Sequence, residues 1–458
     1  MAMRAPVRHA GNEPLFQAVE LSVLARRWGV PLHLHAQGLR GTGKTTVLRA
    51  VRALLPPIRR IRGCLFNCDP ERPHCPEHRG LEPERLERIG TEEVPMPFLE
   101  ISASAKVGTV VGTIDLARLA EDRPALLPGT IAQAHRGILF VDEINRLADV
   151  APELADVLLD VMGTRPGRLQ IEEAGLPRVE LPVNVTVWAA SNPDEEPGPL
   201  EEVRRQLADR FDLQVRMGRP SDPAAVEAIL RRDLLAGEGQ GGEAEDPGAG
   251  DPFAPLRAAL VRPRVAGGGE RLRALLAAVY TRFGLESLRA VEAWQLAARL
   301  EALRRGADRA GEEELLATLA LVLGGRMAPE EQAEVERFLR EPAPVAEMVR
   351  RAAPAARAEG AAGAPPRSGD GLPPAAEALQ SGEDGWLRRV LGRLGLPPAA
   401  GAAAPGAGGG AGGETGPGEG RVGAARQGPP PPWAPPEPAR LWRQVPPAER
   451  FREARPEP

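Results

Sequence analysis

Short apolar runs alternate with helical patterns over the first three quarters of the chain. The apolar runs lie at residues 31–37, 98–102, 137–143, 184–191 and 212–217. Buried strands separated by helical segments are typical of βαβ units in a parallel sheet that is covered on both faces. From 254 to 340 the pattern is helical, with no strand signal. The sequence therefore predicts an α/β domain at 12–220 and an all-α domain at 221–343, with an acidic, Gly-rich surface loop at 236–252.

The pattern is lost after residue 343. The Ala/Gly/Pro-rich stretches of 344–458 cannot bury enough apolar surface to offset chain entropy, so we expect a mostly disordered tail. Two islands interrupt it, at 385–396 with apolar residues at helical spacing and at 439–445 with a Trp. Residual helicity without a partner and short partner-docking helices both account for these islands.

Composition narrows the function classes. The net charge of −5 argues against a general binder of polyanions. We expect no membrane span, because no run of ~18 apolar residues occurs, and no secretory signal, because residues 1–14 lack an apolar core. Three cysteines make a poor disulfide framework, which favours a reducing, cytoplasmic location.

A glycine-rich loop directly follows the first apolar run. The segment GLRGTGKT (38–45) fits the pattern G-x-x-x-x-G-K-[ST], and a helical pattern follows it. In such a loop the glycines let backbone N–H groups surround phosphates, Lys44 would reach the β- and γ-phosphates, and Thr45 would bind Mg²⁺. Lys44 is one of two lysines among 58 basic residues, which argues against an accidental match. The loop residues expected to bind ATP are Gly38, Gly41, Thr42, Gly43, Lys44 and Thr45.

Polar residues at the ends of two further apolar runs complete the pattern of an ATPase site. In ILFVDEIN (138–145), Asp142 is expected to hold Mg²⁺ through water, and Glu143 to polarise the attacking water as general base. The run 184–191 is followed by Asn192, whose amide could orient that water near the γ-phosphate. A lone Asn after a strand is usually a turn former, but the neighbouring motifs favour the catalytic interpretation.

The order of these motifs resembles that of AAA+ ATPases. The segments RGTGKTTVLRA, VVGTIDLARL, LLPGTIAQAHRGILFVDEINRL, LLDVM and QLADRFDLQV together resemble the magnesium-chelatase ATPase subunit and its MoxR-like relatives, over roughly residues 12–335. The resemblance implies a parallel sheet of strand order 5-1-4-3-2, a helical lid, and a ring that is commonly hexameric.

The resemblance also carries individual residues. Arg210 in ADRF matches the arginine finger, which reaches the ATP site of the neighbouring protomer. Arg289 matches the lid arginine called sensor 2, although Arg282, Arg299 and Arg304 lie close by. Residues 168–183 read as a hairpin that in the family faces the partner or the pore. Residues 102–116 correspond to an insertion near helix 2, but without the charged run expected there.

These features predict a motor subunit that transmits ATP hydrolysis to a partner with a von Willebrand A domain. Alternatives are a MoxR-type chaperone for maturing a cofactor site in another protein, a non-hydrolysing scaffold subunit of the ring, and a DNA translocase. Intact Lys44, Asp142 and Glu143 argue against the scaffold. The predicted hairpin carries glutamates beside its two arginines, so a nucleic-acid partner is disfavoured.

All three cysteines lie in one short segment, GCLFNCDPERPHCPEH (63–78). Cys64, Cys68, Cys75 and His78 have spacings compatible with a structural Zn²⁺ site, and His74 could replace His78. An iron–sulfur cluster and reduced cysteines that only pack remain as alternatives. The segment is expected to be a loop outside the nucleotide site.

Overall fold

The computed structural model describes residues 6–102, 104–115, 125–172, 178–192, 201–231 and 251–341. The predicted surface loop at 236–252 falls almost entirely outside these ranges, and the predicted disordered tail at 344–458 falls wholly outside them. Among the described residues, none of the helices combines the length and the apolar character needed to cross a bilayer.

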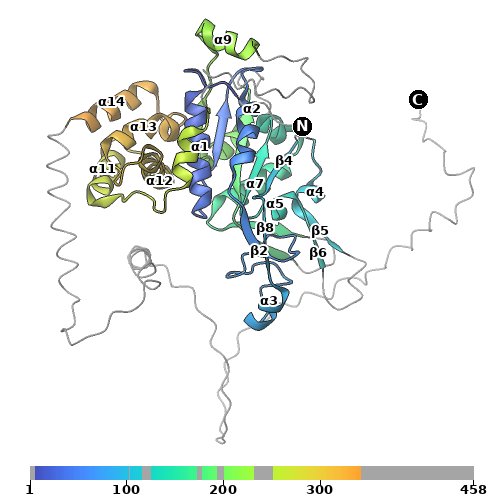
Figure 1. Ribbon diagram of the computed structural model, residues 1–458. Coiled ribbons are helices and arrows are strands. Elements are labelled where there is room, and N and C mark those ends of the chain that lie inside the picture. The colour runs from blue at the N-terminus through green and yellow to red at the C-terminus, as the bar shows by residue number, and fades with distance from the viewer. Residues whose placement is uncertain are drawn as a thin grey trace, which may run out of the picture. The chain divides into compact units, whose positions relative to one another are not determined.

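A five-stranded parallel sheet forms the centre of the fold (Figure 1). Its strands run in the order β11-β1-β10-β7-β4, which is 5-1-4-3-2 when these five are numbered along the chain. The predicted fold class and strand order are thus confirmed, although each strand is shorter than its apolar run. The strands are β1 (Leu34–Gln37), β4 (Phe98–Ile101), β7 (Ile138–Val141), β10 (Thr186–Ser191) and β11 (Leu213–Arg216).

The sheet buries both of its faces. Alternate residues of β7 and β10, such as Phe140 and Trp188, belong to one apolar core, and their neighbours, such as Leu139 and Ala189, belong to the other. This two-sided burial explains why the strands read as continuous apolar runs instead of alternating ones. Along the chain, one helix precedes the first strand of the sheet and the others lie between its strands. They are α1 (Glu13–Arg27), α2 (Lys44–Ala50) with the 3-10 helix η1 (Val51–Leu54), α5 (Thr130–Gln133), α6 (Ile144–Val150), α7 (Pro152–Gly163) and α8 (Glu201–Arg210).

Residues 254–340 are helical, as predicted. After α9 (Pro223–Leu230), the helices are α10 (Ala254–Leu260), α11 (Gly269–Arg282), α12 (Leu288–Arg305), α13 (Glu312–Leu323) and α14 (Pro329–Arg340). Their apolar residues join the core that contains α1 and one face of the sheet. The indole Nε1 of Trp188 donates to Ser22 Oγ on α1 at 2.8 Å, and that of Trp294 donates to the Leu315 carbonyl at 3.1 Å. Within the described residues, α1 therefore links the sheet to the helices; the boundary at residue 220 stays a prediction.

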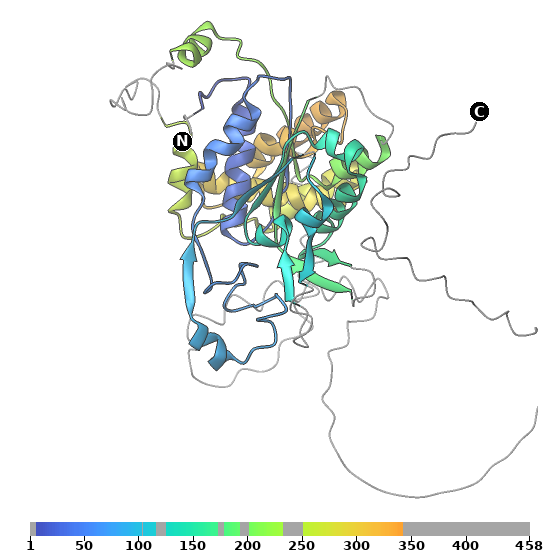
Figure 2. The same ribbon diagram turned by 90° about the vertical axis from the view of Figure 1, so that its right-hand side faces the viewer.

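Three two-stranded antiparallel ribbons accompany the sheet. The predicted hairpin at 168–183 is present as β8 (Gly167–Ile171) paired with β9 (Val179–Val183). Two ribbons were not predicted: β2 (Ile58–Ile61) with β3 (Thr91–Val94), and β5 (Gly112–Asp115) with β6 (Ala125–Pro128). The short helices α3 (Pro83–Ile89) and α4 (Val107–Val111) adjoin them. Figures 1 and 2 show β2 and α3 extending from the end of the molecule opposite α2.

Candidate active site

The glycine-rich loop connects β1 to α2, as its spacing predicted. Gly41 (φ 74°) and Gly43 (φ 88°) adopt left-handed backbone conformations that side chains other than glycine rarely tolerate. A Cβ on Gly38 would lie 3.0 Å from the Met217 carbonyl, so this glycine lets the loop pass close to β11. The loop thus uses its glycines where the backbone turns sharply or packs closely.

Lys44 and Thr42 are folded onto the loop itself. The Lys44 ammonium donates to the Leu39 carbonyl at 2.8 Å and also to the Gly38 carbonyl, while Thr42 Oγ1 donates to the Leu39 carbonyl at 2.8 Å. These carbonyl contacts use part of the hydrogen-bonding capacity of the ammonium. A phosphate would have to draw Lys44 away from them, which a charge-assisted hydrogen bond is strong enough to do.

The predicted acidic pair follows β7. Glu143 has a left-handed backbone (φ 55°) at the start of α6, an uncommon conformation for a residue with a side chain and one that concentrates at functional sites. Its carboxylate accepts from Arg146 Nη1 at 2.7 Å. Asp142 is half-buried, and Arg49, which binds Glu100 at 2.7 Å, lies 3.9 Å from its carboxylate.

Burial raises the pKa of Asp142, and the nearby charges of Glu143 and Glu100 act in the same direction, while Arg49 opposes them. These three carboxylates share two arginines, Arg49 and Arg146, which leaves this edge short of positive charge. A divalent cation would supply that charge, and hard oxygen ligands such as Asp142 and the Thr45 hydroxyl suit Mg²⁺. The residues present therefore fit the predicted Mg²⁺.

The third polar element follows β10, which lies between β1 and β7. The register pairs Gln37 with Ser191 and Val141 with Ala189, so the segments after these three strands emerge at one edge of the sheet. The buried Asn192 comes directly after β10. The phosphate loop, the acidic pair and Asn192 thus leave three adjacent strands at their carboxyl ends, where open α/β sheets bind ligands.

The two predicted arginines lie next to each other at the junction of β11 and the helices. Arg210 ends α8, and its carbonyl accepts from Arg289 Nη2 at 3.0 Å. Arg289 Nε also lies 3.4 Å from Asp212 Oδ1. The structure therefore joins Arg289 to the main chain of Arg210.

The chain is similar in sequence to known magnesium-chelatase subunits. The chain is 35% identical over 304 residues to the magnesium-chelatase 38 kDa subunit of Acidiphilium rubrum, which covers 64% of this chain and 82% of that protein. The chain belongs to the magnesium-chelatase 38 kDa subunit family. The corresponding subunit of Cereibacter sphaeroides is 33% identical over 329 residues, covering 69% and 90%. No family model matches the chain.

A solved structure of the magnesium-chelatase BchI–BchD complex is also similar, with a TM-score of 0.36 and 24% identity, covering 73% of this chain and 98% of that one. Family membership confirms the prediction of an AAA+ ATPase of the magnesium-chelatase type. The roles of the individual residues rest on the motifs and geometry above.

Residues 209–212, which include Arg210, form a segment that we call the arginine segment. Two residues that hold this segment were not predicted from the sequence. Asp212 is fully buried, accepts from the His33 backbone N–H at 2.8 Å, and faces Arg289 and Arg165. Arg326 donates to the Phe211 carbonyl at 2.6 Å and the Asp209 carbonyl at 3.2 Å. The position of Asp212, directly before an apolar strand, indicates that its carboxylate is buried. A buried carboxylate needs a nearby cation, so the sequence did carry a signal for Asp212. No local signal marked Arg326.

Proposed function

We propose that the chain is the ATP-hydrolysing subunit of a magnesium-chelatase-like complex and works as a ring, commonly a hexamer. The observation that carries the proposal is the convergence of the phosphate loop, the acidic pair and Asn192 at one edge of the sheet. In this role Lys44 binds the β- and γ-phosphates, Glu143 polarises the attacking water, and Asn192 orients it.

Thr45 and Asp142 would hold Mg²⁺, which when bound neutralises phosphate charge. Glu143 would first have to leave Arg146, its partner at 2.7 Å, to act as a general base. That contact is exposed, so breaking it costs about 1 kcal/mol or less.

Arg210 is proposed to complete the site of the next protomer. Its main chain is tied to Arg289 on α12 and its neighbours are tied to Arg326, so movement of the helical segment would be passed to this arginine. These contacts support a role for Arg289 in relating nucleotide state to the helical lid. An arginine finger in other systems contributes ~10³–10⁵ in rate.

A protein partner is proposed because the relatives are named as subunits of magnesium chelatase. The family resemblance implies that this partner carries a von Willebrand A domain. The β8–β9 hairpin supports a protein partner over nucleic acid. Its arginines are paired with glutamates, Arg168 with Glu180 at 2.9 Å and Arg178 with Glu172 at 2.9 Å. A cytoplasmic location, expected from the cysteines, is part of the same proposal.

The test is ATP turnover by wild type and by Glu143→Gln. We expect turnover to fall by roughly 10²–10⁴-fold in the variant, the usual effect of a general base, with ATP binding retained. Glu153→Gln, an exposed glutamate at the start of α7, is the matched control and should turn over normally. Equal turnover by wild type and Glu143→Gln would contradict the proposal. The Glu143→Gln protein, expected to stay bound to ATP, is also suited to capture the partner from the native complex.

A further inference from the structure

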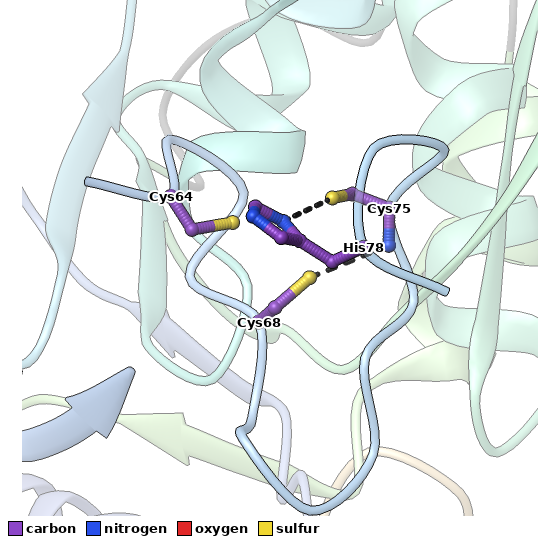
Figure 3. Close-up of side chains that lie close together, drawn as sticks. All are labelled: Cys64, Cys68, Cys75 and His78. Atoms are coloured by element: carbon purple, nitrogen blue, oxygen red, sulfur yellow. Dashed lines mark hydrogen bonds between the residues drawn. The ribbon is translucent and has the colours of Figure 1, made fainter. Parts of the chain in front are cut away.

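Four soft or borderline metal ligands gather in the segment between β2 and α3. The side chains of Cys64, Cys68, Cys75 and His78 are all buried, and one ligand atom from each lies within 4.8 Å of the others. Figure 3 shows the three sulfur atoms arranged around the imidazole ring of His78. All three cysteines are free of disulfides. The segment thus brings together the whole cysteine content of the chain at one point.

The local backbone turns the sulfur atoms inward. Cys64 precedes a turn in which the Asn67 N–H donates to the Cys64 carbonyl at 3.2 Å, and Asn67 has a left-handed backbone (φ 51°). Around Cys75, the N–H groups of His78 and Arg79 donate to the Cys75 carbonyl at 3.1 and 2.9 Å. The two turns present their cysteines toward each other from both ends of the segment.

Polar groups lie close to the sulfur atoms of Cys68 and Cys75, and two of them are backbone N–H donors. The backbone N–H groups of His74 and Cys75 lie 3.4 and 3.3 Å from Cys68 Sγ. His78 Nδ1 lies 3.0 Å from Cys75 Sγ. Amide donors directed at sulfur stabilise a thiolate, the form that binds metals. Buried thiols that merely filled space would have no need of such donors.

His78, and not His74, is the histidine of the cluster. His74 Nδ1 lies 3.2 Å from Cys68 Sγ, but its ring stacks on His135 with centroids 3.8 Å apart. Its Nε2 is buried and has no hydrogen-bond partner. His74 therefore forms an outer contact to the Cys68 sulfur, a position that in metal sites orients the ligand.

We propose that Cys64, Cys68, Cys75 and His78 bind one structural Zn²⁺. Three thiolates and one imidazole are a set that Zn²⁺ takes up in tetrahedral geometry, and four protein ligands leave no open position for catalysis. Binding releases three thiol protons to solvent, while the neutral imidazole contributes a lone pair. An iron–sulfur cluster would ordinarily use a fourth cysteine.

The site lies away from the ATP edge. Its segment is attached to the residues just before β7: Asn67 Nδ2 donates to the Gln133 carbonyl at 2.6 Å, and Arg136 Nη1 donates to the Arg59 carbonyl at 2.6 Å. Arg136 also lies 3.5 Å from Asp69. These contacts are at the amino end of β7, whereas Asp142 follows its carboxyl end. Zinc would therefore hold the 64–78 loop in the conformation from which Asn67 contacts the residues just before β7.

The test is elemental analysis of the full chain for zinc and iron, after dialysis against a weak chelator and with excess Mg²⁺ and ADP to occupy the nucleotide site. We expect about one zinc per chain in wild type. Cys75→Ser and His78→Ala should each lose most of it, and Glu77→Gln, an exposed side chain between these two ligands, is the matched control and should keep it. Nucleotide binding measured on the same samples separates loss of zinc from loss of fold or of the proposed ATPase function.

Cobalt substitution of the wild type tests the same site without any variant. We expect Co²⁺ to give the intense ligand-field bands of a tetrahedral site together with thiolate-to-metal charge transfer. An octahedral cobalt spectrum, iron in place of zinc, or full zinc retention in both Cys75→Ser and His78→Ala would each overturn the proposal.

Discussion

The buried Asp212 offers the clearest energetic test of how the arginine segment is held. The substitution Asp212→Asn keeps the volume of the side chain and one oxygen that can accept from the His33 N–H, now 2.8 Å away. It removes the negative charge that faces Arg289 at 3.4 Å and Arg165 at 3.7 Å. The new amide nitrogen at this position would also point an N–H donor at the guanidinium groups of Arg289 and Arg165, which are themselves donors.

The expected cost follows from burial. Asp212 is 0% exposed, whereas the side chains of Arg289 and Arg165 are 22% and 41% exposed. Breaking a fully buried pair costs ~3–5 kcal/mol, but water can take over part of the solvation of both arginines, so we expect about 2–3 kcal/mol. For a folded unit of roughly 300 residues, with an unfolding entropy of about 2.1 cal/mol/K per residue, that corresponds to a fall in unfolding midpoint of roughly 3–5 °C.

Thermal unfolding followed by circular dichroism measures this shift. Asp251→Asn is the control, because Asp251 pairs with Arg257 at 2.6 Å with side chains that are 38% and 61% exposed. Despite its shorter distance, this surface pair should change the midpoint by no more than roughly 1–2 °C. Equal shifts for the two variants would refute the argument from burial. ATP turnover of Asp212→Asn at a temperature where it stays folded should fall about 10-fold, because Arg289 also holds the Arg210 carbonyl.

Two further predictions concern the phosphate loop and the strand beneath it. Lys44→Ala should weaken ATP binding by roughly 30- to 100-fold in a fluorescent-nucleotide titration, the loss expected for a charged hydrogen bond, while exposed Lys106→Ala should bind normally. Burial lowers the pKa of both His33 and His35 to about 4 in the folded chain. In the unfolded chain a histidine has a pKa of about 6.5, so below pH 6.5 the unfolded chain binds more protons than the folded one. The unfolding midpoint should therefore be level above about pH 7 and fall from pH 6.5 toward 4, and the fall should be smaller in His35→Gln; an equal fall would exclude His35 as a cause.

The central sheet and the nucleotide motifs were predictable because their signals are local. The strands are buried on both faces, so their apolar runs stand out, and the phosphate loop is defined by glycines and a lysine within eight residues. The apolar runs are longer than the strands that they contain. The run 31–37, for example, contains β1 only at Leu34–Gln37, because apolar residues next to a strand can pack in the core without pairing in the sheet.

The missed features depend on contacts between distant positions. The β2–β3 ribbon consists of IRRI and TEEV, where charged residues such as Arg60 and Glu92 pair across the strands at 2.7 Å and hide any apolar alternation. Asp212 and Arg289 are separated by 77 residues, so neither sequence neighbourhood announces the other. The choice of His78 over His74 likewise required the ring of His135, which lies far along the chain.

The most direct test of the central claim is ATP turnover by a mixture of two inactive variants. Lys44→Ala lacks the phosphate-loop lysine, and Arg210→Ala lacks the proposed finger; each alone should be nearly inactive. Coexpressed in equal amounts, they should recover roughly a quarter of wild-type turnover, because a head-to-tail ring forms that fraction of interfaces with an intact Lys44 on one side and an intact Arg210 on the other. Lys44→Ala coexpressed with the Lys44→Ala, Arg210→Ala double variant should recover none. If the first mixture stays as inactive as its parents, the site is not shared between protomers and the proposed ring mechanism is wrong.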